Sequence, residues 1–193
     1  MSKRILILQG HPDASQPHLC HALASSYSAG AEGAGHTVKH VNVAEVDFPL
    51  LHTQKDFETG TVPVNLKTIQ DDLLWAEHVV VFFPLWLGDM PAMLKGFFEQ
   101  LLRPSFVGEY ANYFDKKVLS GRSARVVATM GMPAAIYRWY FRAHSVKSLE
   151  RSLLGTVGFA PVDETLIGNV GNMKPAEATK WLRKLERLGV GAE

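Results

Sequence analysis

The stretch HVVVFFPLWLGDMP, residues 78–91, carries the clearest structural signal in the chain. Residues 78–83 are a short, mainly apolar run, which indicates a strand buried on both faces of a sheet. Pro84 ends that strand, and a short apolar loop follows. Asp89 is a candidate cap for the next helix, with Pro91 in its first turn. A buried strand that leads through a short loop into a helix is typical of parallel sheets.

The same alternation of strands and helices continues on both sides of this stretch. Apolar or valine-rich runs predict strands at 4–9, 37–43, 78–83, 124–130 and within 159–170. Apolar residues at helical spacing predict helices at 17–32, 66–76, 91–101 and 175–188. We expect irregular connections at 48–63 and 103–122, and a long aromatic-rich segment at 135–154. This order predicts an α/β fold, a three-layer sandwich with a five-stranded parallel sheet.

Length and composition limit the class of protein. The 193 residues are enough for one domain, which we place at residues 1–193. An apolar content of 47% against 20% charged residues is that of a globular protein. The formal net charge of +1, without a block of like charges, argues against a protein that binds nucleic acid.

The sequence lacks the apolar segments that membrane insertion or secretion needs. The longest uninterrupted apolar run, residues 79–87, is far shorter than the ~20 residues of a membrane helix. Residues 5–8 are too few for the apolar part of a signal peptide. We therefore expect no integral membrane segment and a cytoplasmic location.

Three loops are the expected ligand-binding region, because parallel sheets bind ligands where their strands end. The first, residues 10–17, opens directly into a helix. Free amides at a helix N-terminus, with serine, glutamine and histidine side chains nearby, suit a phosphate group. The alternative is a simple helix cap with solvated histidines.

The other two loops, 84–90 and 131–137, offer apolar walls and backbone amides. Trp86 and Leu87 would suit a planar ring, or would simply close the top of the core. Residues 137–144 combine aromatic side chains with two arginines, which indicates an interface or a cover over a ring-shaped ligand.

Other chemistry has little support in the sequence. His18 and His21 have a metal-compatible spacing, but no third ligand lies nearby, so we expect no metal site. Cys20 is the single cysteine, which excludes an internal disulfide. It has no evident base partner, so nucleophilic catalysis is not indicated.

Four segments carry a resemblance to a known family. They are ILILQGHP (5–12), VFFPLW (81–86), PAMLKGFF (91–98) and ATMG (128–131). The most specific feature is a strand that ends in Pro-Leu-Trp, followed by Met-Pro-Ala and Leu-Lys-Gly. In order and spacing, over nearly the whole chain, they resemble the flavodoxin-like NAD(P)H:quinone oxidoreductases, which include mammalian quinone reductases and small bacterial relatives.

The resemblance implies a bound flavin, FMN with FAD as the alternative, and NAD(P)H as hydride donor. It assigns the ribityl phosphate region to His11, Ser15, Gln16 and His18. It assigns the flavin ring to Pro84, Leu85, Trp86 and Leu87, and its pyrimidine end to Thr129 and Gly131. It also implies that Tyr137 and His144 lie over the pyrimidine edge as catalytic residues.

The activity that the resemblance implies is hydride transfer from NAD(P)H through flavin N5 to a quinone or similar acceptor, with donor and acceptor using one place in turn. Two other functions stay open. One is a flavodoxin-type electron carrier, against which the aromatic cover at 137–141 argues. The other is a regulatory flavoprotein subunit of a membrane transporter.

A homodimer is expected on two grounds. The resemblance implies it, with the active site at the subunit interface. Independently, residues 132–142 hold more large apolar side chains than one short helix face can bury. Arginines interleaved with aromatics are also enriched in interface cores.

Overall fold

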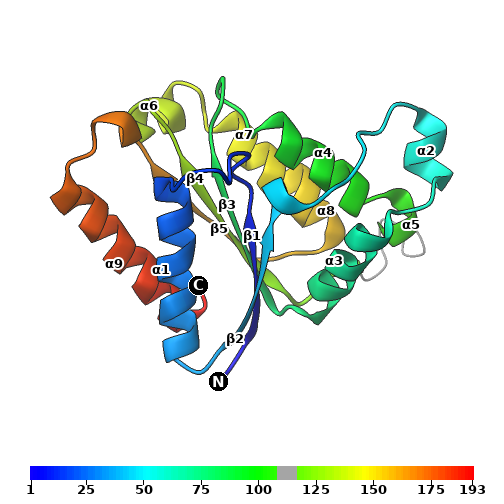
Figure 1. Cartoon of the computed structure of the whole chain (residues 1–193), viewed down its shortest axis with the longest axis horizontal. Helices are drawn as coiled ribbons and strands as arrows, with labels where there is room; N and C mark the ends of the chain where they lie inside the picture. Colours follow the sequence, from blue (N-terminus) through cyan, green and yellow to red (C-terminus); the bar gives the residue numbers. More distant parts are fainter. Residues whose placement is uncertain (108–116) are drawn as a thin grey trace.

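The computed structural model describes residues 1–107 and 117–193 (Figure 1). Within them, five parallel strands form one sheet in the order β2-β1-β3-β4-β5. The strands are β1 (Arg4–Gln9), β2 (Thr37–Asn42), β3 (His78–Pro84), β4 (Ser123–Thr129) and β5 (Val162–Ile167). This arrangement confirms the predicted α/β fold and the five-stranded parallel sheet.

Helices cover both faces of the sheet. The helices α1 (Leu19–Gly33) and α9 (Pro175–Gly191) lie side by side on one face (Figure 1). The other face is covered by α3 (Val64–Trp75), α4 (Ala92–Leu101), α7 (His144–Ser148), the π-helical segment η3 (Leu149–Leu154) and α8 (Gly155–Val157). Two short 3₁₀ segments, η1 (Val43–Glu45) and η4 (Val170–Asn172), follow β2 and β5.

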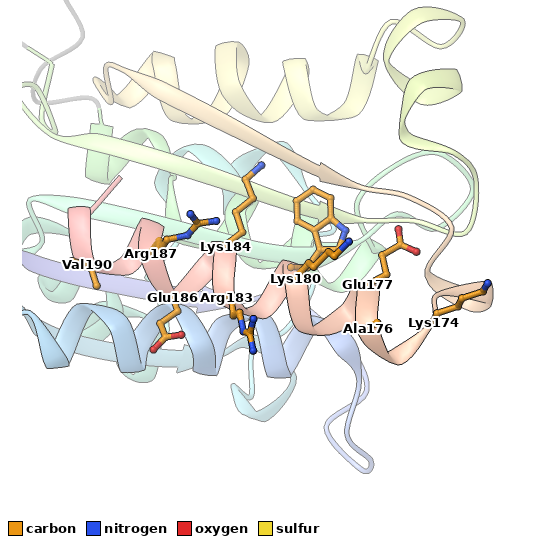
Figure 2. A pocket seen from close by; sticks show the side chains of 10 residues that line it. Lys174, Ala176, Glu177, Lys180, Arg183, Lys184, Glu186, Arg187 and Val190 are labelled. Carbon is orange, nitrogen blue, oxygen red and sulfur yellow. The ribbon is translucent and has the colours of Figure 1, made fainter.

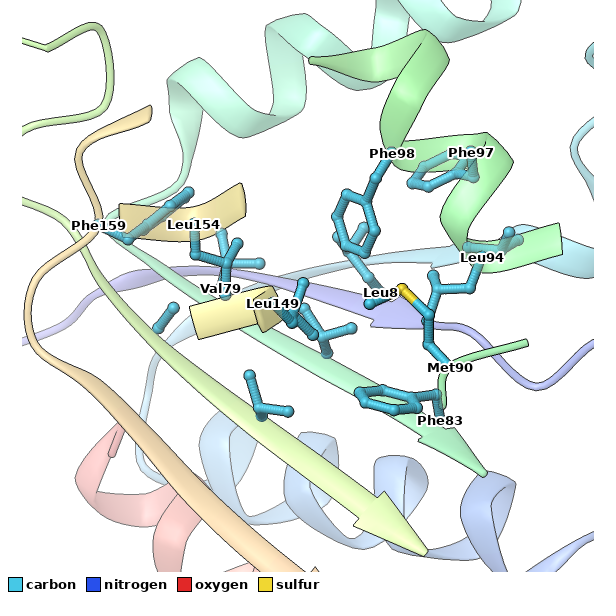
Figure 3. Packing of buried hydrophobic residues seen from close by; sticks show 14 of the residues in the cluster. Leu8, Val79, Phe83, Met90, Leu94, Phe97, Phe98, Leu149, Leu154 and Phe159 are labelled. Atoms are coloured by element: carbon cyan, nitrogen blue, oxygen red, sulfur yellow. The ribbon is translucent and has the colours of Figure 1, made fainter. Parts of the chain in front are cut away.

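The core consists of two apolar layers, one on each side of the sheet. In β1, Ile5 and Ile7 face α1, whereas Leu6 and Leu8 face the opposite layer. Side chains from β3, α4 and η3 interdigitate in that layer, where Phe83, Leu94 and Leu149 are fully buried (Figure 3). Burial on both faces explains why the strands have continuous apolar sequences instead of alternating ones.

The contact between α1 and α9 is unusually close because glycines line it. A methyl group on Gly30 would lie 2.0 Å from the carbonyl oxygen of Glu186, and one on Gly189 would lie 2.0 Å from that of Tyr27. Neither position can therefore hold a side chain without a shift of the backbone. The two helices approach each other through their backbones.

Several elements differ from the prediction. The connection 48–63 contains a helix, α2 (Gln54–Thr59), which is capped by the Thr53 hydroxyl accepting the Asp56 amide. The irregular segment 103–122 contains α5 (Pro104–Val107), and its part 108–116 lies outside the described residues. The aromatic segment forms α6 (Ala134–Trp139) and then turns sharply into α7.

The predicted cap Asp89 is wrong, because α4 begins at Ala92 with Pro91 as its N-cap residue. Asp89 instead closes a turn with Trp86, through hydrogen bonds of 2.8 and 3.0 Å between their backbones. Its carboxylate accepts the Ser145 hydroxyl from the start of α7. Asp89 therefore ties the loop after β3 to α7.

The strands end level with one another, which brings their loops together. Gly10 donates its amide to the Phe82 carbonyl at 2.7 Å, and Leu85 donates to the Thr129 carbonyl at 2.7 Å. The chain moves outward from β1 to β2 and then returns to β3, so strand order reverses between β1 and β3. Ligand sites of such sheets lie at this point. No helix of the described ranges is long and apolar enough to cross a membrane.

Candidate functional site

Two adjoining cavities lie at the carboxyl ends of the strands. The first, which we call the histidine cavity, measures about 340 Å³ and lies between the loops after β1, β3, β4 and β5. The second, the His144 cavity, measures about 350 Å³ and lies between the loops after β3 and β4 and the start of α7. Leu85, Met130 and Gly131 line both cavities. The two therefore form one row along the sheet edge.

The side chain of Gln9, the last residue of β1, holds the loop after this strand in place. It donates to the Cys20 carbonyl at 3.1 Å and accepts the His11 amide at 3.1 Å. Gly10 has no room for a side chain, because a methyl group there would lie 2.7 Å from Leu94. Together these contacts hold His11 at the floor of the histidine cavity, with only 7% of its surface exposed.

Three histidines meet at this loop, where the sequence analysis grouped His11 with His18 and, separately, His18 with His21. The rings of His11 and His18 stack with centroids 3.9 Å apart, and the His21 ring lies 5.1 Å from that of His11. Burial lowers the pKa of His11 and of His21, and the neighbouring His18 lowers both further. His11 and His21 are therefore neutral at pH 7, because their ordinary pKa is already ~6.5.

The hydrogen bonds of the cluster define the tautomer of His21. Its Nδ1 accepts the His18 amide at 3.3 Å, so Nε2 carries the hydrogen. Nδ1 of His11 lies 3.1 Å from the Asp13 amide nitrogen and 3.2 Å from the Asp13 carbonyl oxygen, so either tautomer of His11 has a partner there. The His21 Nε2 is buried without a partner in the described part of the chain. The cluster therefore holds one buried N–H donor without an acceptor among the described residues.

Asp13 is the centre of the remaining polar contacts in this loop. Its carboxylate accepts the Ser15 amide at 2.8 Å, the Ser15 hydroxyl at 2.6 Å, Gln16 Nε2 at 3.1 Å and His18 Nε2 at 2.8 Å. These hydrogen bonds hold the pKa of Asp13 well below its usual range, and the bond from the Ser15 hydroxyl has the largest effect. The sequence analysis gave Asp13 no role.

The loop after β3 forms a tight turn with an exposed apolar tip. Leu87 and Gly88 both have positive φ, 51° and 83°. The Leu87 side chain is fully exposed, and the half-exposed Trp86 ring stands edge-on to His11 with centroids 6.4 Å apart. The Trp86 amide is used within the turn, whereas the Leu87 and Gly88 amides have no backbone acceptor in the described part of the chain.

The loop after β4 supplies the wall between the two cavities. Thr129 is buried and pairs with Pro84 across the sheet. Gly131 is open, since a methyl group there would meet nothing within 4 Å. Cys20 lies beneath, where burial raises the pKa of its thiol to about 12. The raised pKa disfavours the thiolate, which is the nucleophilic form of cysteine.

His144 and Tyr137 differ in accessibility. His144 lines the second cavity close to Gly88, and its Nδ1 lies 3.2 Å from the Phe141 carbonyl oxygen. Tyr137 is fully buried; its hydroxyl accepts the Val146 amide at 3.4 Å, and burial raises its pKa. The rings lie 6.0 Å apart. Tyr137 therefore packs behind His144 and lines neither cavity.

The structure brings most of the predicted site residues together. His11, His18, Pro84, Leu85, Trp86, Thr129 and Gly131 line the histidine cavity, and Leu87 and His144 line the other. Ser15 and Gln16 join them through Asp13. Sequence reasoning missed Met130, which lines both cavities, and Val170 and Gly171 from the loop after β5. The only available signal for that loop was its position after a predicted strand.

A larger hollow runs along α9 and shares no residue with these two cavities (Figure 2). It measures about 1320 Å³ and is lined by one helix, with Lys180, Arg183, Lys184 and Arg187 among its side chains. Lys184 lies over the Trp181 ring. The described residues hold no group of three or more His, Cys, Asp or Glu side chains arranged for a metal ion.

The sequence profile of a family described as "Flavodoxin-like fold" matches residues 3–188. The chain belongs to this flavodoxin-like family. Rat NAD(P)H dehydrogenase [quinone] 1 is 24% identical over 141 residues, which are 68% of this chain and 51% of the rat protein. The chain thus spans about half the length of that relative.

Several solved structures have the same fold as this chain. An NAD(P)H:quinone oxidoreductase from Methanothermobacter marburgensis superimposes with a TM-score of 0.83 at 21% identity, over all of this chain and 97% of that one. An FMN-dependent NADH-azoreductase from Bacillus anthracis, solved with FMN, has a TM-score of 0.74 at 16% identity, over 97% of each chain. These likenesses concern the fold.

Proposed function

We propose that this chain is a flavin-dependent NAD(P)H oxidoreductase that reduces a quinone or a similar acceptor. The observation that carries the proposal is the row of two joined cavities, with N–H donors at one end and an accessible histidine at the other. The similarity to a rat quinone dehydrogenase and to an archaeal quinone oxidoreductase supports it.

In this proposal the phosphate end of the flavin lies at the loop after β1. His11, Ser15, Gln16 and His18 provide the donors. The residues fit such a group, because Ser15, Gln16 and His18 already donate to an anion, the Asp13 carboxylate. The buried His21 Nε2 beside them has no partner among the described residues.

The flavin ring lies in this proposal against Pro84, Leu85, Trp86 and Leu87, with Thr129 and Gly131 at its pyrimidine end. The free amides of Leu87 and Gly88 are the donors available to its heteroatoms, since the Trp86 amide already binds Asp89. FMN is the proposed form. The similar fold of an FMN-dependent azoreductase supports this choice over FAD.

A bound flavin supplies hydride transfer between a reduced nicotinamide and the acceptor. In this proposal His144 exchanges a proton at the pyrimidine edge of the flavin. Its Nδ1 donates to the Phe141 carbonyl, which orients the ring and leaves Nε2 for the exchange. Tyr137 holds the backbone beside His144 through the Val146 amide. The His144 cavity offers one place for both donor and acceptor, so they would bind in turn.

A homodimer is part of the proposal. Ile136, Trp139, Tyr140 and Phe141 on and after α6 are exposed, and Phe141 lines the His144 cavity together with the exposed Leu87. An apolar patch of this size beside a cavity is unusual on a soluble monomer. A second copy that covers it would also wall off the two cavities.

The test is reconstitution of the purified protein with FMN and with FAD. We expect one FMN per chain by absorption and by mass analysis of the released cofactor. Steady-state kinetics with NAD(P)H and a quinone should then give parallel double-reciprocal lines. A protein that binds neither flavin would refute the proposal, and intersecting lines would refute the shared place for donor and acceptor.

A further inference from the structure

The loop that would receive the flavin phosphate already holds an anion, the carboxylate of Asp13. Every side chain of the loop that was assigned to phosphate, apart from His11, donates to it: Ser15, Gln16 and His18. No lysine or arginine forms a salt bridge with it among the described residues; the ring nitrogen that lies nearest to it is His18 Nε2, at 2.8 Å. The loop therefore forms an anion-binding site that the carboxylate of Asp13 occupies.

This carboxylate leaves part of the site unsatisfied. The Nε2–H group of His21 belongs to the ring cluster of His11 and His18, and it is buried with no acceptor in the described part of the chain. His11 is more than nine-tenths buried and faces the histidine cavity. A carboxylate has two acceptor oxygens, whereas a terminal phosphate has three. The donor set therefore matches a larger anion than the one it holds.

A phosphate and the Asp13 carboxylate cannot share these donors. The Ser15 hydroxyl has a single hydrogen and His18 Nε2 has one, and each now points at Asp13. Two anions a few ångströms apart also repel each other. Binding of a phosphate therefore requires the Asp13 side chain to move out, and it lies partly exposed, at 33%, where it has room to do so.

We propose that Asp13 is a resident competitor for the phosphate of the flavin: it holds the phosphate donors in the free protein and is displaced when the phosphate binds. Asp13 thereby sets how much affinity the phosphate contributes. This inference rests on the proposed function, and it makes Asp13 a specificity residue, since it acts on phosphorylated ligands and leaves flavins without phosphate unaffected.

The experiment compares FMN with riboflavin, which lacks the phosphate, by fluorescence titration of the wild type and of Asp13→Asn. The amide retains an oxygen that accepts the Ser15 amide but removes the charge. We expect FMN to bind on the order of fivefold more tightly to Asp13→Asn, the effect of one partly exposed charge. Riboflavin affinity should not change.

The matched control is Glu45→Gln. Glu45 lies in η1, is exposed, and acts on His21 only through its charge. It touches none of the donors, so its removal should change FMN affinity less than twofold. Equal gains in both variants would mean a general charge effect, and would overturn the proposal. An unchanged or weaker FMN affinity in Asp13→Asn would overturn it as well.

Inorganic phosphate gives a readout that needs no flavin. Titrated into the wild type, it should shift the NMR signals of the Ser15 amide and the His18 ring, with a lower dissociation constant in Asp13→Asn. If the wild type binds neither flavin, the proposed function fails. The phosphate titration alone then tests whether Asp13 competes with phosphate for the donors of the loop. If flavin binds and Asp13→Asn behaves as wild type towards FMN and phosphate, only the Asp13 proposal fails.

Discussion

His144 is the residue on which the proposed chemistry depends most. Its ring lines the second cavity, whereas Tyr137 lies buried behind it. We expect His144→Ala to lower the rate of flavin reduction by about 10- to 1000-fold, the usual loss for one positioned proton donor. FMN affinity should stay within about threefold of the wild type. Stopped-flow absorbance measures the rate, and fluorescence titration measures the affinity.

Two variants serve as comparisons for this prediction. Tyr137→Phe should lower the rate less than His144→Ala does, and should cost about 1 kcal/mol of stability, because the Val146 amide loses its acceptor. His52→Ala, an exposed histidine outside the site, should leave rate and affinity unchanged. If His144→Ala reduces flavin at the wild-type rate, His144 is structural only.

The residues of the site were predictable to different extents. Positions at or just after the end of a strand, such as His11, Leu85 and Thr129, could be placed because parallel strands end at one sheet edge. The role of Asp13 could not, since it depends on how the loop folds back to bring Ser15 and His18 onto one carboxylate. Val170 was missed because the sequence gives no clear end to the last strand.

At the scale of elements, the contact of α1 with α9 gives a sharp test of packing. Gly30→Ala places a methyl group 2.0 Å from the Glu186 carbonyl oxygen, so we expect a loss of about 2 kcal/mol or more in the free energy of unfolding. Helix propensity alone would predict a gain of about 1 kcal/mol. Urea denaturation measures the difference.

Gly33→Ala is the matched control for Gly30→Ala. Gly33 lies in the same helix, and a methyl group there meets nothing within 4 Å. It should stabilise the protein by up to about 1 kcal/mol. The packing account would be wrong if both substitutions changed stability in the same direction by the same amount.

Elements that bury apolar residues were predictable, and an element that buries none was not. The β3 run is apolar throughout because every residue of that strand is buried. The helix α2 buries no residue, so it leaves no apolar periodicity in the sequence. The break between α6 and α7 arises at Arg142 and Ala143, which have positive φ although neither residue type favours it.

At the scale of the whole molecule, the exposed aromatic surface predicts assembly. Trp139 is 79% exposed, so Trp139→Glu costs the free chain little, but places a charge in a desolvated interface of the proposed dimer. We expect the variant to be largely monomeric by light scattering, with reduced activity. Val64→Glu, equally exposed on α3, should remain dimeric. A fully active monomer, wild type or variant, would contradict the dimer.

The pH dependence of stability should report on His78. This side chain is buried and burial lowers its pKa to about 4, so the unfolded chain, with a pKa of ~6.5, binds the proton more readily. The neutral His78 therefore contributes fully to the free energy of unfolding above pH ~6.5. This contribution is lost as the pH falls towards 4, by up to about 3 kcal/mol. His78→Gln, which keeps a polar partner for Ser123, should flatten this loss.

Urea denaturation at fixed protein concentration between pH 7.5 and 4.5 measures both curves. The comparison isolates His78, because His11, His21 and His40 also have lowered pKa values and act equally in both proteins. Parallel curves for wild type and His78→Gln would show that His78 is not the source.

The pairing of α1 with α9 also has a consequence for synthesis on the ribosome. The α1 helix is made early, and its apolar residues Leu23 and Tyr27 belong to the layer that α9 completes through Leu185. The rest of the sheet emerges before that partner does. One face of the nascent sheet therefore stays uncovered until α9 has been made, so a chaperone that guards the growing polypeptide would find exposed apolar surface on α1.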